Sequence, residues 1–254
     1  MDKSKIAAQM YSVRKELAAD PDKTFRELKD IGFQAVQIDG FRGHEAAEIQ
    51  QLVVKYGFRI AGMHIHHRRF FDDLDGLIQE ALLFDCEILF DKYIDDEEQN
   101  EAGYRATKKQ LFHVQDVLRN LGFVIGLHCP EYDYPNQVDG AKVLSYITKP
   151  KAGLSLIAEP DTYWMSVAGI DPVEEIKQYA WRAPIIHLKD YKKGFDPQDM
   201  DHNLVELGKG DVDFPAIVQW GEQNGVQYYC VEQDYSHIGM FNSMRESFDY
   251  LTSL

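Results

Sequence analysis

The sequence predicts an α/β protein: a (β/α)8 barrel, also called a TIM barrel, in a single domain that spans residues 1–254. Three observations predict this fold. A helix–glycine–strand phrase recurs along the chain, the strands are apolar along their whole length, and eight such units fill the usual length of this barrel, about 250 residues. No Pro-, Gly- or Ser-rich linker and no low-complexity tract divides the chain.

Glycine marks the junction between a helix and the next strand at four places. At each place a helical pattern stops at the glycine, and an apolar, β-branched run follows directly. Glycine readily adopts the left-handed conformation that ends a helix, and a short connection then leads into the strand. These residues are Gly32, Gly57, Gly122 and Gly225.

The same patterns place the other elements in chain order. Strands are predicted near 6–11, 33–39, 58–65, 86–91, 123–128, 153–158, 184–188 and 227–232. Amphipathic segments predict helices near 22–31, 44–56, 72–84, 100–121, 138–148, 172–180, 213–224 and 241–253. Strands that are apolar throughout are typical of a parallel sheet covered on both faces. An open doubly wound sheet is the alternative, but neither a dinucleotide fingerprint nor a phosphate-binding loop follows a predicted strand.

The composition limits the partners of this chain. It is 44% hydrophobic, and 27 Lys and Arg against 42 Asp and Glu give a net charge of -15. Such a field repels phosphate backbones and anionic lipid surfaces, so we expect no nucleic acid or membrane partner. The start, "MDKSKIAAQMYSV", lacks the apolar region of a secretory signal, and no apolar run approaches the roughly 20 residues that cross a bilayer. We therefore expect a cytoplasmic protein.

The three cysteines, Cys86, Cys129 and Cys230, lie in or beside apolar stretches. None has the C-x-x-C spacing of a zinc knuckle or redox motif. We expect reduced cysteines in the core and no disulfide framework.

Polar side chains follow every predicted strand. In a barrel the carboxyl ends of the strands and the loops after them form the active site. Taken singly, a histidine or aspartate there is often a turn former or a satisfied polar group. Carboxylates and imidazoles that converge on one opening need a compensating cation, and a divalent metal ion supplies it. These residue types suit Mn, Mg, Zn or Co without discriminating among them. The strand-end residues are Gln9, Tyr11, Gln37, Asp39, His64, His66, His67, Asp91, Lys92, His128, Glu131, Glu159, Asp161, His187, Lys189, Asp190, Glu232 and Asp234.

Two of these residues have a competing structural explanation inside the barrel. Lys189 can pair with Asp190 or Asp161 and only set the local field. Glu159 can be an inward residue that is satisfied within the barrel. Both alternatives stay open at the level of the sequence.

Two loop segments also allow more than one interpretation. His66 and His67, which precede "RRFF", can form a basic loop for an anionic group or a solvated turn. The acidic stretch 95–101 is expected to be a helix N-terminus, where the helix dipole favours negative charge.

Several phrases resemble one known family. "EPDTYW" at 159–164, "HLKD" at 187–190 and "YYCVEQD" at 228–234 are specific in this order and spacing, although each alone is weak. "GFQAVQIDGF" at 32–41 and "LGKGDVDFPAI" at 207–217 extend the likeness over nearly the whole chain. Together they resemble the xylose isomerase-like TIM barrels, and in particular the sugar phosphate isomerase/epimerase group.

The resemblance implies one metal ion held by residues from four neighbouring strands. The typical ligands are a carboxylate from strand five, an aspartate from six, a histidine from seven and a glutamate from eight. On this chain the last three are Asp161, His187 and Glu232. The fifth strand departs from the glutamate pattern and offers His128 in "LHCPEYDY", which is similar to a His-Asn-His run without its second histidine. We expect His128 to be the fourth ligand.

The reaction implied by the resemblance is the isomerisation or epimerisation of a sugar or sugar phosphate. A proton is removed next to a carbonyl, and the resulting enediolate is stabilised by the metal. Glu232 is expected to serve as ligand and base, with His128 or Glu131 as the facing acid. Contacts to a small carbohydrate substrate are expected from Gln9, Tyr11, His64, Trp164, Lys189 and Asp234.

Other functions use the same residues. A dehydratase or lyase acting on a keto-sugar or inosose needs the same proton abstraction, and an altered barrel can bind a sugar without catalysis. Endonucleases for abasic DNA in this superfamily need more metal ligands and a basic groove, which the acidic charge argues against. Barrels of this kind often pair, which leaves a homodimer possible.

Overall fold

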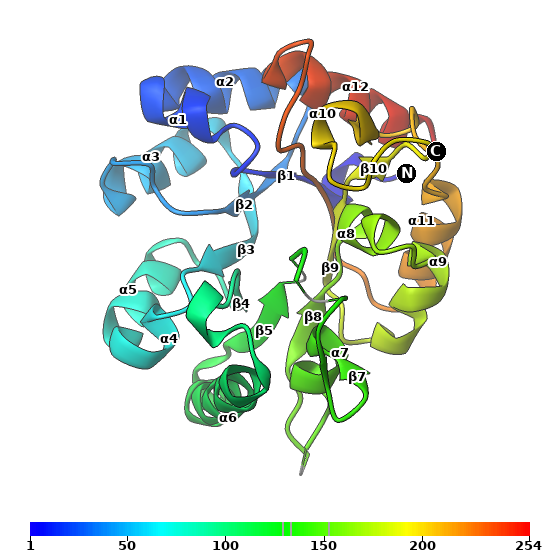
Figure 1. The fold of residues 1–254 in the computed structure, drawn as a ribbon. Helices are drawn as coiled ribbons and strands as arrows, with labels where there is room; N and C mark the ends of the chain where they lie inside the picture. The colour runs from blue at the N-terminus through cyan, green and yellow to red at the C-terminus, as the bar shows by residue number, and fades with distance from the viewer. Residues whose placement is uncertain (129, 133, 152) are drawn as a thin grey trace.

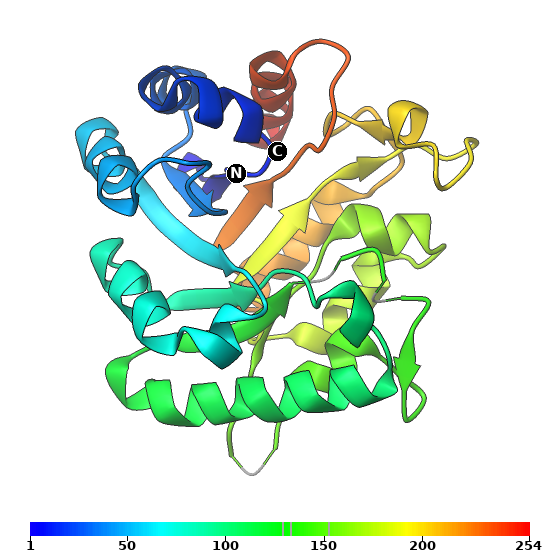
Figure 2. The same ribbon diagram turned by 60° about the vertical axis from the view of Figure 1, so that its left-hand side comes forward.

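The computed structural model describes residues 1–128, 130–132, 134–151 and 153–254. Eight parallel strands form one sheet in the order β8-β5-β4-β3-β2-β1-β12-β9, and helices surround it (Figure 1 and Figure 2). The predicted (β/α)8 barrel is confirmed. The strands are β1 (Ile6–Gln9), β2 (Ala35–Ile38), β3 (Arg59–Ile65), β4 (Ile88–Asp91), β5 (Val124–His128), β8 (Ile157–Glu159), β9 (Ile185–Leu188) and β12 (Tyr228–Val231).

The barrel is nearly closed where the two outer strands of this sheet, β8 and β9, meet. Near their amino ends the Ala158 N–H donates to the Arg182 carbonyl at 2.7 Å. Beyond β8, the His187 N–H donates to the Pro160 carbonyl at 2.9 Å, and Asp161 and His187 form a parallel bridge. Closure therefore places Asp161 directly beside His187.

Each predicted helix has a counterpart, although several are shorter than predicted. The helix predicted at 72–84 begins at Leu74, because Asp73 caps it by accepting from the Gly76 N–H. The one predicted at 172–180 ends as a 3-10 turn, Ile176–Tyr179. The outer helices are α2 (Pro21–Ile31), α3 (Ala46–Tyr56), α5 (Leu74–Leu83), α6 (Glu101–Leu118), α7 (Val143–Thr148), α9 (Pro172–Glu175), α11 (Phe214–Gln223) and α12 (Met240–Ser253).

A small hairpin replaces the first part of the helix predicted at 138–148. Strands β6 (Gln137–Val138) and β7 (Ala141–Lys142) pair antiparallel around Asp139 and Gly140, whose φ angles are 52° and 77°. Asp-Gly is the preferred pair for a two-residue turn with positive φ at both positions. The prediction is wrong before Val143, because the Asp-Gly signal outweighs the helical periodicity.

Short helices follow several strands and build the rim around their carboxyl ends. Each precedes the next outer helix in the chain. These helices are α1 (Arg14–Ala19), α4 (Arg69–Asp72), α8 (Thr162–Val167) and α10 (Met200–Asn203).

The four junction glycines have the positive φ angles predicted for them: 124° at Gly32, 63° at Gly57, 90° at Gly122 and 85° at Gly225. Gly32 has a second reason to lack a side chain. A Cβ atom there would lie 2.7 Å from Cε1 of Phe248 on α12. The glycine therefore also allows α2 and α12 to pack closely.

The side chains inside the barrel change character along each strand. Near the amino ends they are apolar, and two residues further they are polar. Because side chains alternate between the two faces of a strand, residues two apart both point inward. The apolar lower layer contains Ala7, Ala35, Ile157, Ile185 and Cys230, and the polar upper layer contains Gln9, Gln37, Glu159, His187 and Glu232, in the same strand order.

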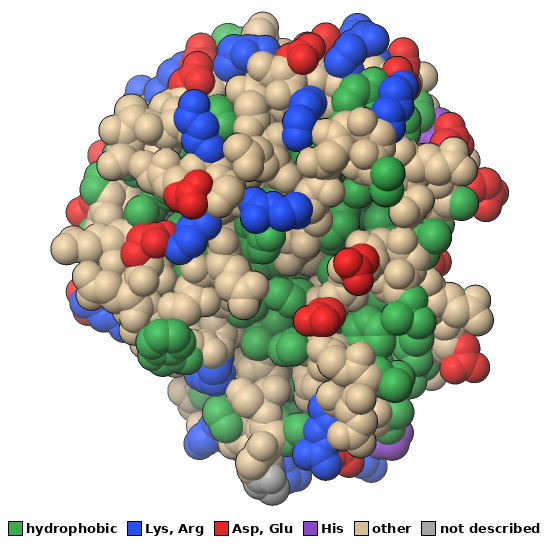
Figure 3. Space-filling view, turned by 180° about the vertical axis from the view of Figure 1, so that it is seen from behind, with side chains coloured by type: hydrophobic (Ala, Val, Ile, Leu, Met, Phe, Trp, Pro, Cys, Tyr) green, Lys and Arg blue, Asp and Glu red, His purple; other side chains and the backbone are tan. Residues whose placement is uncertain are grey.

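The structure also bears on the predictions made for the cysteines and for the surface. Cys86 and Cys230 are buried free thiols, as predicted, whereas Cys129 lies outside the described residues. Among the described residues, no helix combines the length and apolar character needed to span a bilayer. On the face shown in Figure 3, basic and acidic side chains are interspersed. That face therefore offers no continuous positive groove for nucleic acid.

Candidate active site

A cavity of about 610 Å³ opens at the carboxyl ends of the strands. Its walls come from the strand ends and the loops that follow them, where the sequence predicts the active site. Three predicted site residues are fully buried and do not line the cavity: Gln9, Asp161 and His187. The other predicted site residues line the cavity: Tyr11, His64, His128, Glu131, Trp164, Lys189, Glu232 and Asp234.

The four predicted metal ligands meet at one point. Their ligand atoms all lie within 4.8 Å of one another, and each residue is buried. We call this group the outer set; it consists of His128, Asp161, His187 and Glu232. Two carboxylates and two imidazoles from neighbouring strands are therefore close enough to hold one cation between them.

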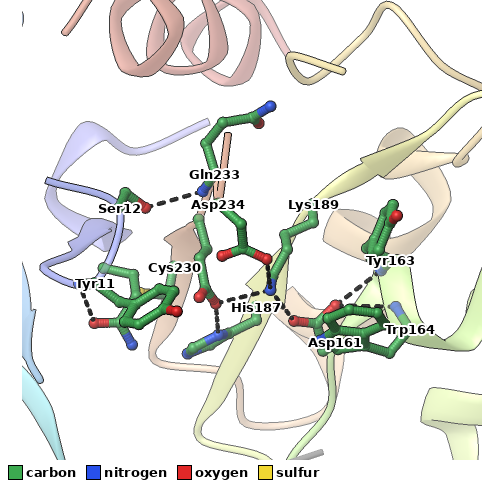
Figure 4. Close-up of polar contacts among 12 residues, drawn as sticks. Tyr11, Ser12, Asp161, Tyr163, Trp164, His187, Lys189, Cys230, Gln233 and Asp234 are labelled. Carbon is green, nitrogen blue, oxygen red and sulfur yellow. Dashed lines mark hydrogen bonds and ion pairs between the residues drawn. The ribbon is translucent and has the colours of Figure 1, made fainter. Parts of the chain in front are cut away.

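Asp161 is held by the helix that follows it. Its Oδ1 atom accepts from the backbone N–H groups of Tyr163 (2.9 Å) and Trp164 (3.3 Å) and caps α8 (Figure 4). Its Oδ2 atom is buried without a hydrogen-bond partner. Burial raises the pKa of Asp161 to about 6, against the opposing charge of Lys189. The cap thus fixes one oxygen and leaves the other facing the site.

His187 and Glu232 form a buried ion pair. The Nδ1 atom of His187 lies 2.5 Å from Oε2 of Glu232, and its Nε2 atom lies 2.7 Å from Oε1 of Gln37. Burial opposes its charge, but Glu159 and Glu232 raise the pKa of His187 well above its ordinary value. Burial would likewise raise the pKa of Glu232, but Lys189 and His187 lower it well below its usual range. A metal ion that binds at His187 would therefore compete with a proton.

Lys189 is the fixed cation of the site. Its Nζ atom lies 3.2 Å from Oδ2 of Asp161, 3.4 Å from Oε2 of Glu232 and 3.1 Å from Oδ2 of Asp234 (Figure 4). The side chain is only 2% exposed, and its ammonium lies 5.2 Å from the centre of the Trp164 ring. Burial opposes the charge, but the three carboxylates raise the pKa of Lys189 well above its ordinary value. Lys189 is therefore a permanent ammonium.

Asp190, the neighbour of Lys189, points the other way and organises a loop. Its side chain accepts from the N–H groups of Gly208 (2.9 Å), Gly210 (2.8 Å) and Val212 (3.2 Å). A Cβ atom at Gly210 would lie 2.3 Å from this carboxylate. Of the two partners considered for Lys189, the structure selects Asp161, and Asp190 is structural.

The outer set fits a divalent cation. The buried Oδ2 atom of Asp161 and Nδ1 atom of His128 lie 3.2 Å from Lys189 Nζ and from Glu159 Oε2, but neither contact has hydrogen-bond geometry, so a cation could replace it. Burial lowers the pKa of His128 to about 3, which keeps the ring in the neutral form that a ligand needs. Oxygen and nitrogen donors in equal number suit several divalent ions. Bound there, a metal ion would share Asp161 and Glu232 with the ammonium of Lys189.

Tyr11 and Glu131 occupy the walls of the cavity. The guanidinium of Arg14 lies 4.1 Å from the centre of the Tyr11 ring and donates to the Tyr11 carbonyl, which fixes this aromatic wall opposite Trp164. Glu131 is exposed at the rim and accepts from the Tyr93 hydroxyl at 3.3 Å.

Glu159 is the polar centre that the sequence left open. It is fully buried; Oε2 lies 2.5 Å from Nε2 of His64, and Oε1 accepts from Nε2 of Gln37 at 2.5 Å. Burial would raise the pKa of Glu159, but His187 and His64 lower it well below its usual value. Glu159 therefore points inward, and its partners come from distant parts of the chain.

His67 is neither part of an anion-binding loop nor part of a solvated turn. It is fully buried, with Nδ1 2.6 Å from Oδ2 of Asp91 and Nε2 2.9 Å from Oε2 of Glu98. Glu98 belongs to the acidic stretch 95–101, which lies at the N-terminus of α6 as predicted, with Asn100 as the cap. Glu98 lies 31 positions after His67 in the chain, so no local sequence pattern signalled this contact.

Three comparisons with known proteins bear on the family. The sequence pattern of the xylose isomerase-like TIM barrel family matches residues 25–254. No match to a curated protein was found. A sugar phosphate isomerase/epimerase from Parabacteroides distasonis superposes with a TM-score of 0.82 at 18% identity, covering 100% of this chain and 95% of the other.

Two further solved structures share the fold at low identity. A xylose isomerase-like TIM barrel protein from Mycobacterium smegmatis, in complex with magnesium, has a TM-score of 0.73 at 16% identity and covers 98% of this chain and 95% of the other. The probable 3-DHS dehydratase AsbF from Bacillus anthracis has a TM-score of 0.69 at 12% identity, with 98% of both chains covered. At such identities the superpositions establish the fold.

Proposed function

The chain belongs to the xylose isomerase-like TIM barrel family, and on that premise we propose that it is a divalent-metal-dependent isomerase or epimerase of a sugar or sugar phosphate. The observation that carries this proposal is the outer set, whose four ligand atoms lie within 4.8 Å of one another beside a cavity large enough for a small carbohydrate. Similarity to a sugar phosphate isomerase/epimerase and to a magnesium complex supports it.

Glu232 is the proposed base. A divalent ion held by the outer set would polarise the substrate carbonyl and stabilise the negative charge that develops as the proton leaves. Glu232 is ionised, lines the cavity and is oriented by His187 at 2.5 Å, so it can accept the proton from the carbon next to the carbonyl. Lys189 lies 3.4 Å from Glu232 and provides a second positive charge near the developing oxyanion.

Glu131 is the better candidate for the facing acid. His128 is neutral because burial lowers its pKa to about 3, which suits a metal ligand better than a proton donor. Glu131 lies at the rim, lines the cavity and has only the Tyr93 hydroxyl as a hydrogen-bond partner among the described contacts. Tyr11 and Trp164 are proposed to pack against the two faces of the sugar. Gln9, His64 and Asp234 are proposed to contact the sugar hydroxyl groups, either directly or through neighbouring side chains.

Solvent deuterium exchange tests this proposal. The protein is loaded with Mn²⁺ and incubated in deuterated water with a panel of keto- and aldo-sugars, free and phosphorylated. We expect deuterium at the carbon next to the carbonyl for at least one sugar, and loss of this exchange in Glu232→Gln. Glu174→Gln, at an exposed position on α9, is the control. Exchange that survives Glu232→Gln rules out its role as the base.

The same experiment separates an isomerase from a dehydratase or lyase. Proton removal followed by loss of a β-hydroxyl or glycosyl group uses the same base, and a solved relative is a probable dehydratase. Mass analysis of the products distinguishes the two, because only elimination releases water or a sugar.

A sugar-binding barrel without catalysis is the second candidate. The observation that favours it is Lys189, whose ammonium already pairs with Asp161, Glu232 and Asp234 at 3.1 to 3.4 Å. Such a protein would bind a sugar equally well with and without added Mn²⁺. Tightening of sugar binding by Mn²⁺, measured by calorimetry, argues for the enzyme.

A further inference from the structure

A second group of potential metal ligands lies next to the outer set and is richer in nitrogen. Its ligand atoms also lie within 4.8 Å of one another, and all four side chains are buried. The three imidazole rings are close together, with centroid separations of 4.6, 4.7 and 5.2 Å. The group consists of His64, His128, Glu159 and His187, from β3, β5, β8 and β9.

The three rings converge on one carboxylate. Nε2 of His64 and Nδ1 of His128 lie 2.5 and 3.2 Å from Oε2 of Glu159, and Nε2 of His187 lies 3.3 Å from Oε1. In a tetrahedral zinc site with arms of about 2.0 to 2.1 Å, ligand atoms are ~3.3 Å apart. The contacts of His128 and His187 have about this length, although each is made to a different oxygen of Glu159, and His64 would have to withdraw from Oε2 by less than ~1 Å.

Independent features prepare these residues for a cation. Nδ1 of His128 is buried, and its 3.2 Å contact with Oε2 of Glu159 lacks hydrogen-bond geometry. Glu159 is steadied by Gln37, which donates to Oε1 at 2.5 Å. Asp39 lies 3.8 Å from Nδ1 of His64, where it can orient that ring when Nε2 binds a metal ion. Support of this kind around a ligand shell typically raises metal affinity by about 10- to 100-fold.

The charge environment also differs from that of the outer set. Lys189 pairs with both carboxylates of the outer set, Asp161 and Glu232. Among the described residues, the ion-pair partners of Glu159 are all imidazoles. A cation among these rings therefore has no fixed ammonium to displace.

We propose that His64, His128, Glu159 and His187 form a second cation site, the inner site, which selects a borderline ion such as Zn²⁺ over Mn²⁺ or Mg²⁺. Three nitrogen donors and one oxygen favour Zn²⁺, whereas the two carboxylates of the outer set are better suited to Mn²⁺ or Mg²⁺. Both groups need His128 and His187, so an ion that is fully coordinated at one site deprives the other of two ligands. The inner site thus makes Zn²⁺ a competitor of the outer-set metal.

The two sites each have ligands that the other lacks, which gives a matched pair of variants. His64→Gln removes a ligand of the inner site only, and Asp161→Asn one of the outer set only. Metal-stripped full-length protein is titrated with Zn²⁺ and, separately, Mn²⁺ against a chromophoric chelator. We expect His64→Gln to weaken Zn²⁺ at least ~10-fold and Mn²⁺ less than ~3-fold, and Asp161→Asn to show the reverse pattern. Zn²⁺ affinity that follows Asp161 instead of His64 would overturn the proposal.

A measurement on the unmodified protein covers the case in which a variant fails to fold. X-ray absorption at the zinc edge counts imidazole ligands, and the inner site provides three where the outer set provides two. Three imidazoles support the inner site; two, or no stoichiometric Zn²⁺, contradict it. Either contradiction leaves the outer set, and the proposed isomerase with Mn²⁺, untouched, because that function is tested by deuterium exchange.

Discussion

The two layers inside the barrel differ completely in character, although they are only two residues apart on the same strands. Ile185 and Cys230 in the lower layer are apolar and belong to one hydrophobic cluster. His187 and Glu232, two residues further along the same strands, form an ion pair. Side chains of both layers are almost fully buried. The difference teaches that burial alone does not distinguish the core from the site in this barrel.

The upper layer is stable only because its charges are paired. An unpaired buried carboxylate costs several kcal/mol, so each must find a cation or hydrogen-bond donors. Glu159 contacts three imidazoles, and Glu232 contacts His187 and Lys189. The lower layer has no such demand and contributes by excluding water. We therefore expect substitutions in the two layers to damage different properties.

The largest effect on stability is expected in the lower layer. Ile185→Ala removes a fully buried side chain and should lower the free energy of unfolding by about 2 to 5 kcal/mol. Its Mn²⁺ affinity should stay within about twofold of the wild type, because no ligand is touched. Urea denaturation and calorimetry measure the two quantities. Val54→Ala, at a position 67% exposed on α3, is the control. A large loss of Mn²⁺ affinity in Ile185→Ala would show that the layers are not separable.

The converse effect is expected in the upper layer. His187→Ala removes a proposed ligand and should lower Mn²⁺ affinity at least 10-fold, or about 1.4 kcal/mol. Its unfolding free energy without metal should change less than that of Ile185→Ala, since Lys189 still neutralises Glu232. His202→Ala, an exposed histidine on α10, is the control. Unchanged Mn²⁺ affinity would mean that the outer set is misassigned.

The layers also show how far the sequence determines the site. Asp161, His187 and Glu232 were among the strand-end candidates, because apolar strands end at these positions and strand ends meet on one rim, and the family resemblance singled them out. The opposite orientations of Lys189 and Asp190 follow from alternation along a strand, once the inward face is known. The sequence alone does not show which face of this strand points inward. It therefore left open whether Lys189 pairs with Asp161 or with Asp190.

Contacts across the barrel were not predictable from the sequence. Gln37 donates to Glu159 from a strand 122 positions away in the chain, and Oε2 of Glu159 lies 2.5 Å from His64. Which side chains meet across the interior depends on the tilt and stagger of all eight strands, which no local pattern encodes. The inner site became visible only with the closed barrel.

The smallest effect on the free energy of unfolding is expected at His67, which lies outside both layers. Substitution there tests whether a buried charge pair can persist outside the barrel interior. Burial opposes its charge, but hydrogen bonds with Asp91 and Glu98 raise the pKa of His67 above its ordinary 6.5. A raised folded-state pKa means that the folded protein holds the proton more tightly, so this contribution is complete below pH 6.5 and is lost as the pH rises through the raised value. His67→Gln should therefore cost about 1 kcal/mol more at pH 6.5 than at pH 9, the difference between a hydrogen bond to a charged group and one to a neutral group. Urea denaturation of both proteins at the two pH values measures this difference. A cost that is the same at both values would mean that His67 is held as a neutral ring, and that in this protein only the interior of the barrel sustains buried charge.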